Sequence, residues 1–246
     1  MKKLLTLVLA ALLVCGMFVT GASAEESGLY QYTVNPDGTA EITKADPKIT
    51  DGNIPAELDG HKVTSIGNAA FDNCGKLKNV VIPEGVESLK SFAFSYCSAL
   101  QSVSLPDSLV SVGCSPFSGC KNLKTVEISP VHPVFVFNNK ALISKQDMTL
   151  VSFLDSKATE YEVIWGIKKI TDEAFWDSSL KKIILPDTVT EIGSAAFYWN
   201  SNLTEVVLPR SLTKIGRQAF TECISLKEIS IPAGVTSIEK QAFQGC

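Results

Sequence analysis

The sequence predicts a mainly β protein: a parallel β-solenoid whose short coils, joined by short 3₁₀ or helical turns, are stacked along one axis. The first observation is a repeat, because the phrase from Leu77 to Cys97 returns from Leu100 to Cys120 with equivalent residues 23 positions apart. The second is that the same phrase begins again at three further leucines, Leu180, Leu203 and Leu226. A fixed period of this length indicates a solenoid, in which each coil contacts its neighbours.

Each repeat contains a strand followed by a proline. In the pattern Leu-x-x-Val-x-Ile the apolar residues alternate as a half-buried strand requires, and β-branched residues prevail. We expect proline to end each strand, because it has no N–H for the ladder and fixes its own φ. These prolines are Pro83, Pro106, Pro186, Pro209 and Pro232. A second short apolar run follows each proline, as in Val86-x-x-Leu89, and predicts the return edge of the coil.

Glycine follows the second run in four coils, at Gly67, Gly113, Gly193 and Gly216. The chain must turn there, and we expect a positive φ, which glycine adopts at little cost.

One phenylalanine per coil comes next, after a small residue. These phenylalanines are Phe71, Phe94, Phe117, Phe175, Phe197, Phe220 and Phe243. We expect their rings to point inward and to stack along the axis, which predicts one continuous core shared by all coils.

The complete phrase is L-x-x-[VI]-x-[IL]-P-x-x-[VL]-x-x-[IV]-G-x-x-A-F-x-x-C, and it covers roughly residues 63–246. It resembles the BspA-like leucine-rich repeats of bacterial and protist surface proteins. The resemblance implies a parallel β-solenoid on a secreted or surface-attached protein that serves adhesion or protein binding.

Residues 1–24 have the pattern of a signal peptide: two lysines, an apolar run from Leu4 to Val19, and the small residues Ala22-Ser23-Ala24. A retained anchor is the alternative, but a run of 16 residues is short for a bilayer. A lipoprotein signal at Cys15 is a second alternative, against which stands the large Val14 before it. We expect cleavage near Ala24, a secreted or cell-surface location, and no membrane insertion of the mature chain.

Residues 25–60 are expected to form an N-terminal cap and its connection to the solenoid, which occupies 61–246. Residues 29–43 alternate around the turn sequence Asn35-Pro36-Asp37-Gly38, and this predicts a β-hairpin. Solenoids need such a cap because their first coil is otherwise open.

The repeat is interrupted at about residues 130–160. From Phe117 the next small-Phe pair lies 58 residues away, instead of 23. Alternating runs at 135–137, 141–143 and 149–153 predict an inserted β-hairpin, which either covers a stretch of solenoid or protrudes to make contacts. At the other end, residues 226–231 are expected to form an open edge strand, met by a partner chain or by residues beyond Cys246.

Six cysteines follow the signal peptide, and five of them stand three residues after the buried phenylalanine: Cys74, Cys97, Cys120, Cys223 and Cys246. Stacked side chains at one repeat position point in parallel and do not favour a disulfide. Since Ser178 and Asn200 replace cysteine in other coils, we expect small, buried, backbone-facing thiols. Cys114–Cys120 remains the alternative pair.

No sequence motif for catalysis, a metal or a cofactor is found. The two histidines, His61 and His132, lie beside turns and are expected to be solvated, and ligands 23 residues apart do not form zinc knuckles. The mature chain keeps 20 basic and 26 acidic residues, about −6, which argues against nucleic acid as a partner. A hydrolase is kept only as a remote alternative, with no residue to nominate.

Two exposed rows are the candidate binding residues. Aromatic residues directly after the buried phenylalanine are predicted to form a rim: Tyr96, Trp176, Tyr198 and Trp199. Lysines on the outer side of the strands form the second row: Lys78, Lys124, Lys181, Lys182 and Lys227. Tyrosine and tryptophan prevail in binding hot spots, although the rim residues could instead pack on neighbouring coils.

These observations predict a non-catalytic binding or adhesion module that recognises an extracellular protein or glycan of a host or neighbouring cell. The alternative is a structural spacer that projects another part of a larger surface protein.

Overall fold

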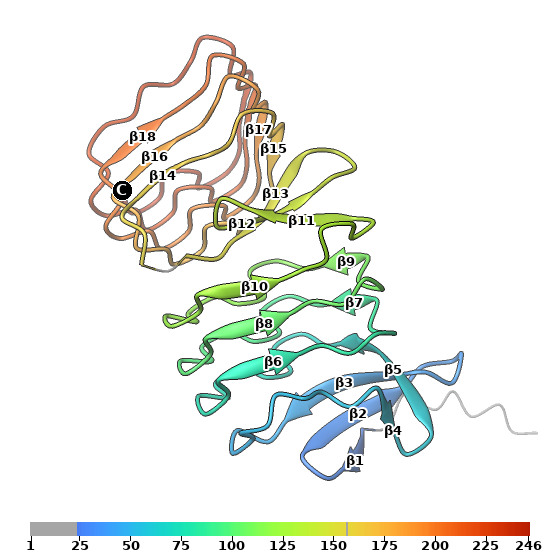
Figure 1. The fold of residues 1–246 in the computed structure, drawn as a ribbon. Coiled ribbons are helices and arrows are strands. Elements are labelled where there is room, and N and C mark those ends of the chain that lie inside the picture. The colour runs from blue at the N-terminus through green and yellow to red at the C-terminus, as the bar shows by residue number, and fades with distance from the viewer. Residues whose placement is uncertain (1–23, 156) are drawn as a thin grey trace, which may run out of the picture.

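The computed structural model describes residues 24–155 and 157–246, so the predicted signal peptide lies almost entirely outside the described residues. The described chain is a parallel β-solenoid built from short strands and turns (Figure 1). It contains no helix in these residues, and the expected 3₁₀ or helical turns are instead separate hydrogen-bonded turns. In one coil, for example, the Ala70 N–H bonds to the Gly67 carbonyl and the Cys74 N–H to the Phe71 carbonyl. The turns cannot merge into a helix because each contains a left-handed residue, Ala69 in the first and Asn73 in the second.

We call residues 46–128 the N-terminal half-solenoid and residues 154–246 the C-terminal half-solenoid. The cap and the N-terminal half contain β1 (Glu25–Ser27), β2 (Tyr30–Val34), β3 (Ala40–Ala45), β4 (Glu57–Leu58), β5 (His61–Ile66), β6 (Asn79–Val81), β7 (Ser88–Leu89), β8 (Ser102–Ser104), β9 (Ser111–Val112) and β10 (Thr125–Glu127). Two sheets run along this half, in the orders β1-β2-β3-β5-β7-β9 and β6-β8-β10, and β4 pairs with β5. The antiparallel hairpin β2–β3 joins the first sheet through a parallel pairing of β3 with β5, so it covers the first coil.

The remaining strands are β11 (Phe135–Asn138), β12 (Ala141–Ser144), β13 (Thr149–Phe153), β14 (Glu160–Glu162), β15 (Lys169–Ile170), β16 (Lys182–Ile184), β17 (Glu191–Ile192), β18 (Glu205–Val207), β19 (Lys214–Ile215) and β20 (Ser237–Ile238). They form two further sheets, in the orders β11-β12-β13-β15-β17-β19-β20 and β14-β16-β18. Neither sheet of the N-terminal half continues into the C-terminal half. Figure 1 shows the second stack of coils turning away from the axis of the first, with β11 and β12 between them.

The inserted segment is a three-stranded antiparallel meander, β11–β12–β13, and not a protruding hairpin. Its last strand pairs in parallel with β15, so the meander also supplies the return edge of a modified coil. Successive side chains of a strand point to opposite faces. Accordingly Leu142 packs in the core of the N-terminal half, whereas Ala141 and Ile143 pack in the core of the C-terminal half.

The phenylalanine rings stack as predicted, but in two files. Neighbouring ring centroids lie 4.6 and 5.6 Å apart along Phe71, Phe94 and Phe117, and 5.1, 4.9, 5.0 and 5.4 Å apart along Phe153, Phe175, Phe197, Phe220 and Phe243. The prediction of one continuous core is therefore wrong, because the meander separates two hydrophobic clusters. Phe153 begins the second file, but it ends strand β13, whereas the other phenylalanines of the file stand in the turn after a return edge, and for this reason the repeat phrase does not reveal it.

The glycines after the return edge are needed for a different reason from the one predicted. None of Gly67, Gly113, Gly193 and Gly216 has a positive φ. A Cβ at Gly113 would instead lie 2.5 Å from the Ser91 backbone nitrogen, and one at Gly193 would lie 2.5 Å from the Asp172 nitrogen. Glycine is required there because the backbones of successive coils approach too closely for a side chain.

The prediction that residues 226–231 form an edge strand is also wrong. The segment lies next to β18 but is not a strand, and no ladder hydrogen bond joins the two in the described structure. A strand with a neighbour on one side only gains half of the ladder bonds of an interior strand, which gives a physical reason for the looser contact.

Candidate functional site

The predicted aromatic rim contains a packed group of rings that we call the aromatic cluster: Phe92, Trp176, Tyr198 and Trp199. The rings of Trp176 and Tyr198 are stacked, with centroids 4.6 Å apart and planes at 14°. Trp199 contacts both of them at 5.9 and 5.5 Å. Phe92 meets the edge of Trp176 at 5.7 Å. Since Phe92 belongs to the N-terminal half and the other three to the C-terminal half, the cluster spans the junction between them.

Phe92 was not among the predicted site residues. It stands two residues before the buried Phe94, where other coils carry small or polar residues: Ala69, Ser115, Glu173, Ala195, Gln218 and Gln241. An aromatic ring at a repeat position that is otherwise small or polar was the signal in the sequence.

Trp199 gives the aromatic cluster its accessible surface. Trp176 and Tyr198 are half-buried against each other, whereas Trp199 is 48% exposed. Its backbone φ is 59°, and the equivalent position is also left-handed in other coils, at Asn73, Tyr96, Asp177 and Glu222. The left-handed turn is therefore a feature of the repeat, and Trp199 differs from these residues in carrying an exposed indole ring within a group of packed aromatic rings.

Tyr96 does not join the other three rim residues. It is 42% exposed, and its ring covers Gly119 so closely that a Cβ there would lie 2.5 Å from a ring carbon. Partial burial, with Asp177 as the next contribution, raises the pKa of Tyr96. Tyr96 therefore packs on the neighbouring coil.

Sequence reasoning also missed Trp165, which is 73% exposed in the turn between β14 and β15. The equivalent turn position holds Glu84, Asp107, Asp187, Arg210 or Ala233 in other coils, so a large aromatic residue there was a detectable departure from the repeat.

The five candidate lysines differ in their surroundings. Lys78 and Lys124 are exposed in the N-terminal half, and Lys181 in the C-terminal half. Lys182 forms an ion pair with Glu205, with 2.7 Å between Nζ and Oε1, and the hydrogen bond to that carboxylate raises its pKa. Lys227 lies on the segment beside β18 that is not a strand. The lysines therefore do not form one uniform row.

Five of the six described cysteines form the predicted backbone-facing row, and all six are free thiols. The Cys97 thiol donates to the Phe71 carbonyl at 3.2 Å, and Cys120 and Cys223 make the same bond to the preceding coil. Burial raises the pKa of Cys74 and of Cys223 to about 12. The thiolate is the reactive form, so these cysteines are structural.

The prediction for His132 is wrong, because its side chain is completely buried. Its Nδ1 accepts hydrogen bonds from the backbone N–H groups of Val134 and Phe135, so its Nε2–H donates to the Pro106 carbonyl at 3.0 Å. The ring fixes the entry to the meander, and no nitrogen is left for catalysis or for a metal.

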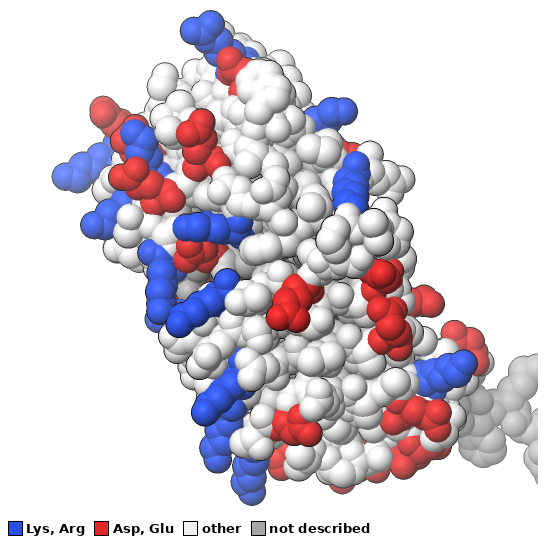
Figure 2. Space-filling view, in the orientation of Figure 1, with Lys and Arg blue, Asp and Glu red and all other residues white. Residues whose placement is uncertain are grey.

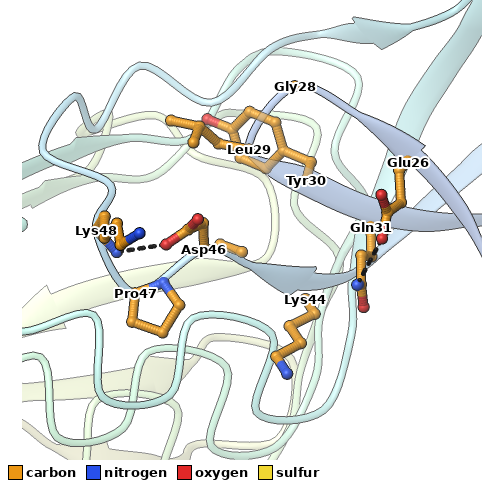
Figure 3. A pocket seen from close by; sticks show the side chains of 10 residues that line it. Glu26, Gly28, Leu29, Tyr30, Gln31, Lys44, Asp46, Pro47 and Lys48 are labelled. Carbon is orange, nitrogen blue, oxygen red and sulfur yellow. Dashed lines mark hydrogen bonds between the residues drawn. The ribbon is translucent and has the colours of Figure 1, made fainter.

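A surface pocket lies beside the N-terminal hairpin (Figure 3) and has a volume of about 350 Å³. Its walls include Tyr30, Lys44 and Asp46. Two of its polar side chains already have partners, since Asp46 accepts from the Lys48 backbone N–H and Gln31 donates to Glu26. The pocket presents no convergent set of free polar groups. Nor do residues 24–155 and 157–246 contain a group of three His, Cys, Asp or Glu side chains that could hold a metal ion.

The fold defines the class first: a repeat protein built as a parallel β-solenoid. A model of the BspA type leucine rich repeat region matches residues 48–158 and 151–246, in 6 copies. The chain therefore belongs to the BspA-type leucine-rich-repeat family, as the repeat phrase indicated. Among curated proteins no sequence matches this chain. In the described part of the chain, no helix has the length and hydropathy to span a bilayer.

Several solved structures are similar to this chain, and two of them illustrate the likeness. One is a leucine rich cell surface protein from Faecalibacterium prausnitzii A2-165, with 21% identity and a TM-score of 0.51 over 92% of this chain and 87% of that chain. The other is the pneumococcal vaccine antigen PcpA, with 19% identity and a TM-score of 0.59 over 88% of this chain and 77% of that chain. At such identities the likeness shows the fold alone.

Proposed function

We propose that this protein is an exported, non-catalytic binding module of the cell surface, which contacts a protein or glycan of a host or neighbouring cell. The observation that carries the proposal is the aromatic cluster, whose outer member Trp199 is 48% exposed. Exposed tryptophan beside further aromatic rings is the composition of a binding hot spot.

Export is supported by the sequence of residues 1–24 and by the description of one similar structure as a cell surface protein. The absence of catalysis is supported by the chemistry of the buried thiols and of His132. The buried thiols are held protonated, and His132 uses both nitrogens for backbone hydrogen bonds.

The test uses the mature chain, residues 25–246, on arrays of extracellular-matrix proteins, mucins and their glycans. Trp199→Ala should weaken any captured interaction at least tenfold, as truncation of a hot-spot residue does. Trp165→Ala is the matched control, because Trp165 is also exposed but lies away from the aromatic cluster, and it should change binding less than twofold.

Equal binding by the Trp199 variant and the unchanged protein would remove the aromatic cluster from the binding surface. Absence of capture on every array would favour the alternative, a structural spacer of a larger surface protein. N-terminal sequencing of the protein recovered outside the cell checks export, with Glu25 expected as the first residue.

A further inference from the structure

One face of the N-terminal half carries more basic than acidic residues. Residues 73–83, 97–106 and 119–129 form the start and the strand of three consecutive coils, and they contain four lysines and one acidic residue, Glu127 at the end of β10. We call these four residues the lysine strip: Lys76, Lys78, Lys121 and Lys124. All four side chains are exposed, and none forms an ion pair with a described acidic residue.

The backbone ladder fixes the spacing of the lysine strip. The Gln101 N–H donates to the Lys78 carbonyl at 2.6 Å, and the Lys124 N–H donates to the Gln101 carbonyl at 2.9 Å. Lys78 and Lys124 are therefore two ladder steps apart, which is about 10 Å along the solenoid axis. Figure 2 shows Lys and Arg side chains gathered along the left edge of this half, beside β6, β8 and β10.

The protein as a whole is acidic, so the lysine strip is a local exception. In the C-terminal half the equivalent strands place Lys182 between Glu160 and Glu205 in register, and its charge is neutralised within the sheet. Along the lysine strip, Lys121 interacts electrostatically with Asp177, whereas Lys76, Lys78 and Lys124 form no ion pair in the described structure. Adjacent positive charges without an ion pair repel one another and attract an anionic ligand.

Beside the lysines, the sheet offers neutral hydrogen-bonding groups. Asn79, Ser102 and Thr125 stand in register on β6, β8 and β10, and the Ser102 hydroxyl donates to the Asn79 side-chain oxygen at 2.8 Å. The three segments contain no aromatic residue and no arginine, and the Tyr96 ring beside the third segment packs on Gly119. They therefore offer neither the tryptophan or arginine anchors of a protein hot spot nor a row of rings on which successive nucleic-acid bases stack.

We propose that the lysine strip binds a linear polysaccharide that bears sulfate and carboxylate groups and lies along the solenoid axis. The anionic groups pair with successive lysines, and the sugar hydroxyls bond to the Asn–Ser–Thr row. The proposal deepens the proposed function and rests on it, since it assigns one ligand class to a surface distinct from the aromatic cluster.

The experiment measures binding of the mature chain to heparin oligosaccharides, with neutral dextran, polyphosphate and single-stranded DNA as comparison probes. Heparin should bind, dextran should not, and the heparin affinity should fall at least tenfold between about 50 and 300 mM NaCl, because exposed charges are screened by salt. The proposal would be overturned if dextran bound as tightly as heparin, or if DNA or polyphosphate bound more tightly than heparin.

Two double variants test whether heparin binding depends on lysines of the N-terminal half or of the C-terminal half. Lys78→Ser with Lys124→Ser should weaken heparin binding at least tenfold. The control is Lys181→Ser with Lys227→Ser, which changes the same repeat position in the C-terminal half and should alter binding less than twofold. Equal losses in the two double variants would show attraction by overall charge and would refute a localised strip. All four side chains are exposed, so melting temperatures should stay unchanged and confirm that each variant is folded.

Failure here is distinguishable from failure of the proposed function. If the unchanged protein does not bind heparin but binds a ligand on the arrays, and Trp199→Ala weakens that binding, the polysaccharide proposal fails. The proposed function as a binding module then stands.

Discussion

The two half-solenoids place different side chains on the same repeat positions of their sheets. In the N-terminal half, Ser65, Ser88 and Ser111 stand in register on β5, β7 and β9. In the C-terminal half the same positions hold Lys169, Glu191 and Lys214 on β15, β17 and β19. Charges of opposite sign alternate there, and Lys169 and Glu191 form an ion pair at 2.8 Å. The repeat fixes the backbone and the inward side chains, and it leaves the outward side chains free to differ.

The interiors of the two halves differ less. Each contains a file of stacked phenylalanines and its own hydrophobic cluster, and β12 is buried between them. The difference lies in the third residue after the stacked phenylalanine. This residue is cysteine throughout the N-terminal half, but it is Ser178 and Asn200 in two coils of the C-terminal half. All of these residues have polar groups that meet the backbone or one another.

The largest expected effect tests whether the two cores are independent. Leu142 and Ile143 are adjacent and almost fully buried, yet they pack in different cores. Truncation of either to alanine should lower the free energy of unfolding by about 2–5 kcal/mol. Hydrogen exchange should show Leu142→Ala loosening the coils of Phe94 and Phe117, and Ile143→Ala loosening those of Phe175 and Phe197.

Each variant serves as the control for the other. Equal loss of protection throughout residues 46–246 in both variants would mean that the cores unfold together.

A smaller effect is expected at the repeat position that holds Asn200, where the side-chain amide replaces the cysteine thiol of other coils. The Asn200 side-chain amide donates to the Phe175 carbonyl at 2.8 Å, and the Ser178 hydroxyl donates to its oxygen. Asn200→Ala leaves these buried groups unpaired and should lower the free energy of unfolding by about 1–3 kcal/mol. Asn200→Cys should recover part of the loss, because a thiol makes the same bond in other coils. Chemical denaturation measures both, and equal losses would show that the thiol bond adds no stability.

The smallest effect concerns the junction. One carboxylate oxygen of Glu173, Oε2, is buried without a partner, and the Glu173 carbonyl accepts from the Ser115 hydroxyl at 2.5 Å. Burial, and then the charge of Asp172, raise the pKa of Glu173 above its ordinary value of 4.5. The folded protein therefore holds this proton more tightly than the unfolded chain, so stability falls as the pH rises from 4.5 through the raised pKa and stays lower above it.

Glu173→Gln removes this charge and should raise the melting temperature at pH 7.5 by about 1–3 °C, with no gain near pH 4. The measurement is thermal unfolding at both pH values. An equal shift at both values would contradict the titration and point to a packing effect. Asp172→Asn is the comparison variant, and it should give a smaller gain because Asp172 is exposed.

The repeat phrase was sufficient to predict the solenoid, the prolines at the strand ends and the inward stacking of the phenylalanines. Period and alternation reflect a local geometry that is the same in every coil, and for this reason they can be read from one chain. Phe153 and Phe92 could not be assigned in this way, because their roles depend on which coils become neighbours across the insertion.

For the candidate binding residues too, the sequence predicted the positions, and the tertiary packing was needed to show their contacts. The sequence placed Trp176, Tyr198 and Trp199 at turn positions, but only the packing shows that the first two stack on each other and leave Trp199 exposed. Similarly, Lys78 directly precedes β6 and Lys182 begins β16, and only the register of neighbouring strands places Glu160 and Glu205 beside Lys182.

By itself the sequence determined the repeating coil, its inward and outward positions, and membership of a family of repeat proteins. Only the tertiary structure decided that the meander divides the core, that glycine is needed for close approach of backbones, and which exposed charges lack a partner. The physical reason is range: strand periodicity and turn preference act within a few residues, whereas these features arise between residues 20 or more positions apart.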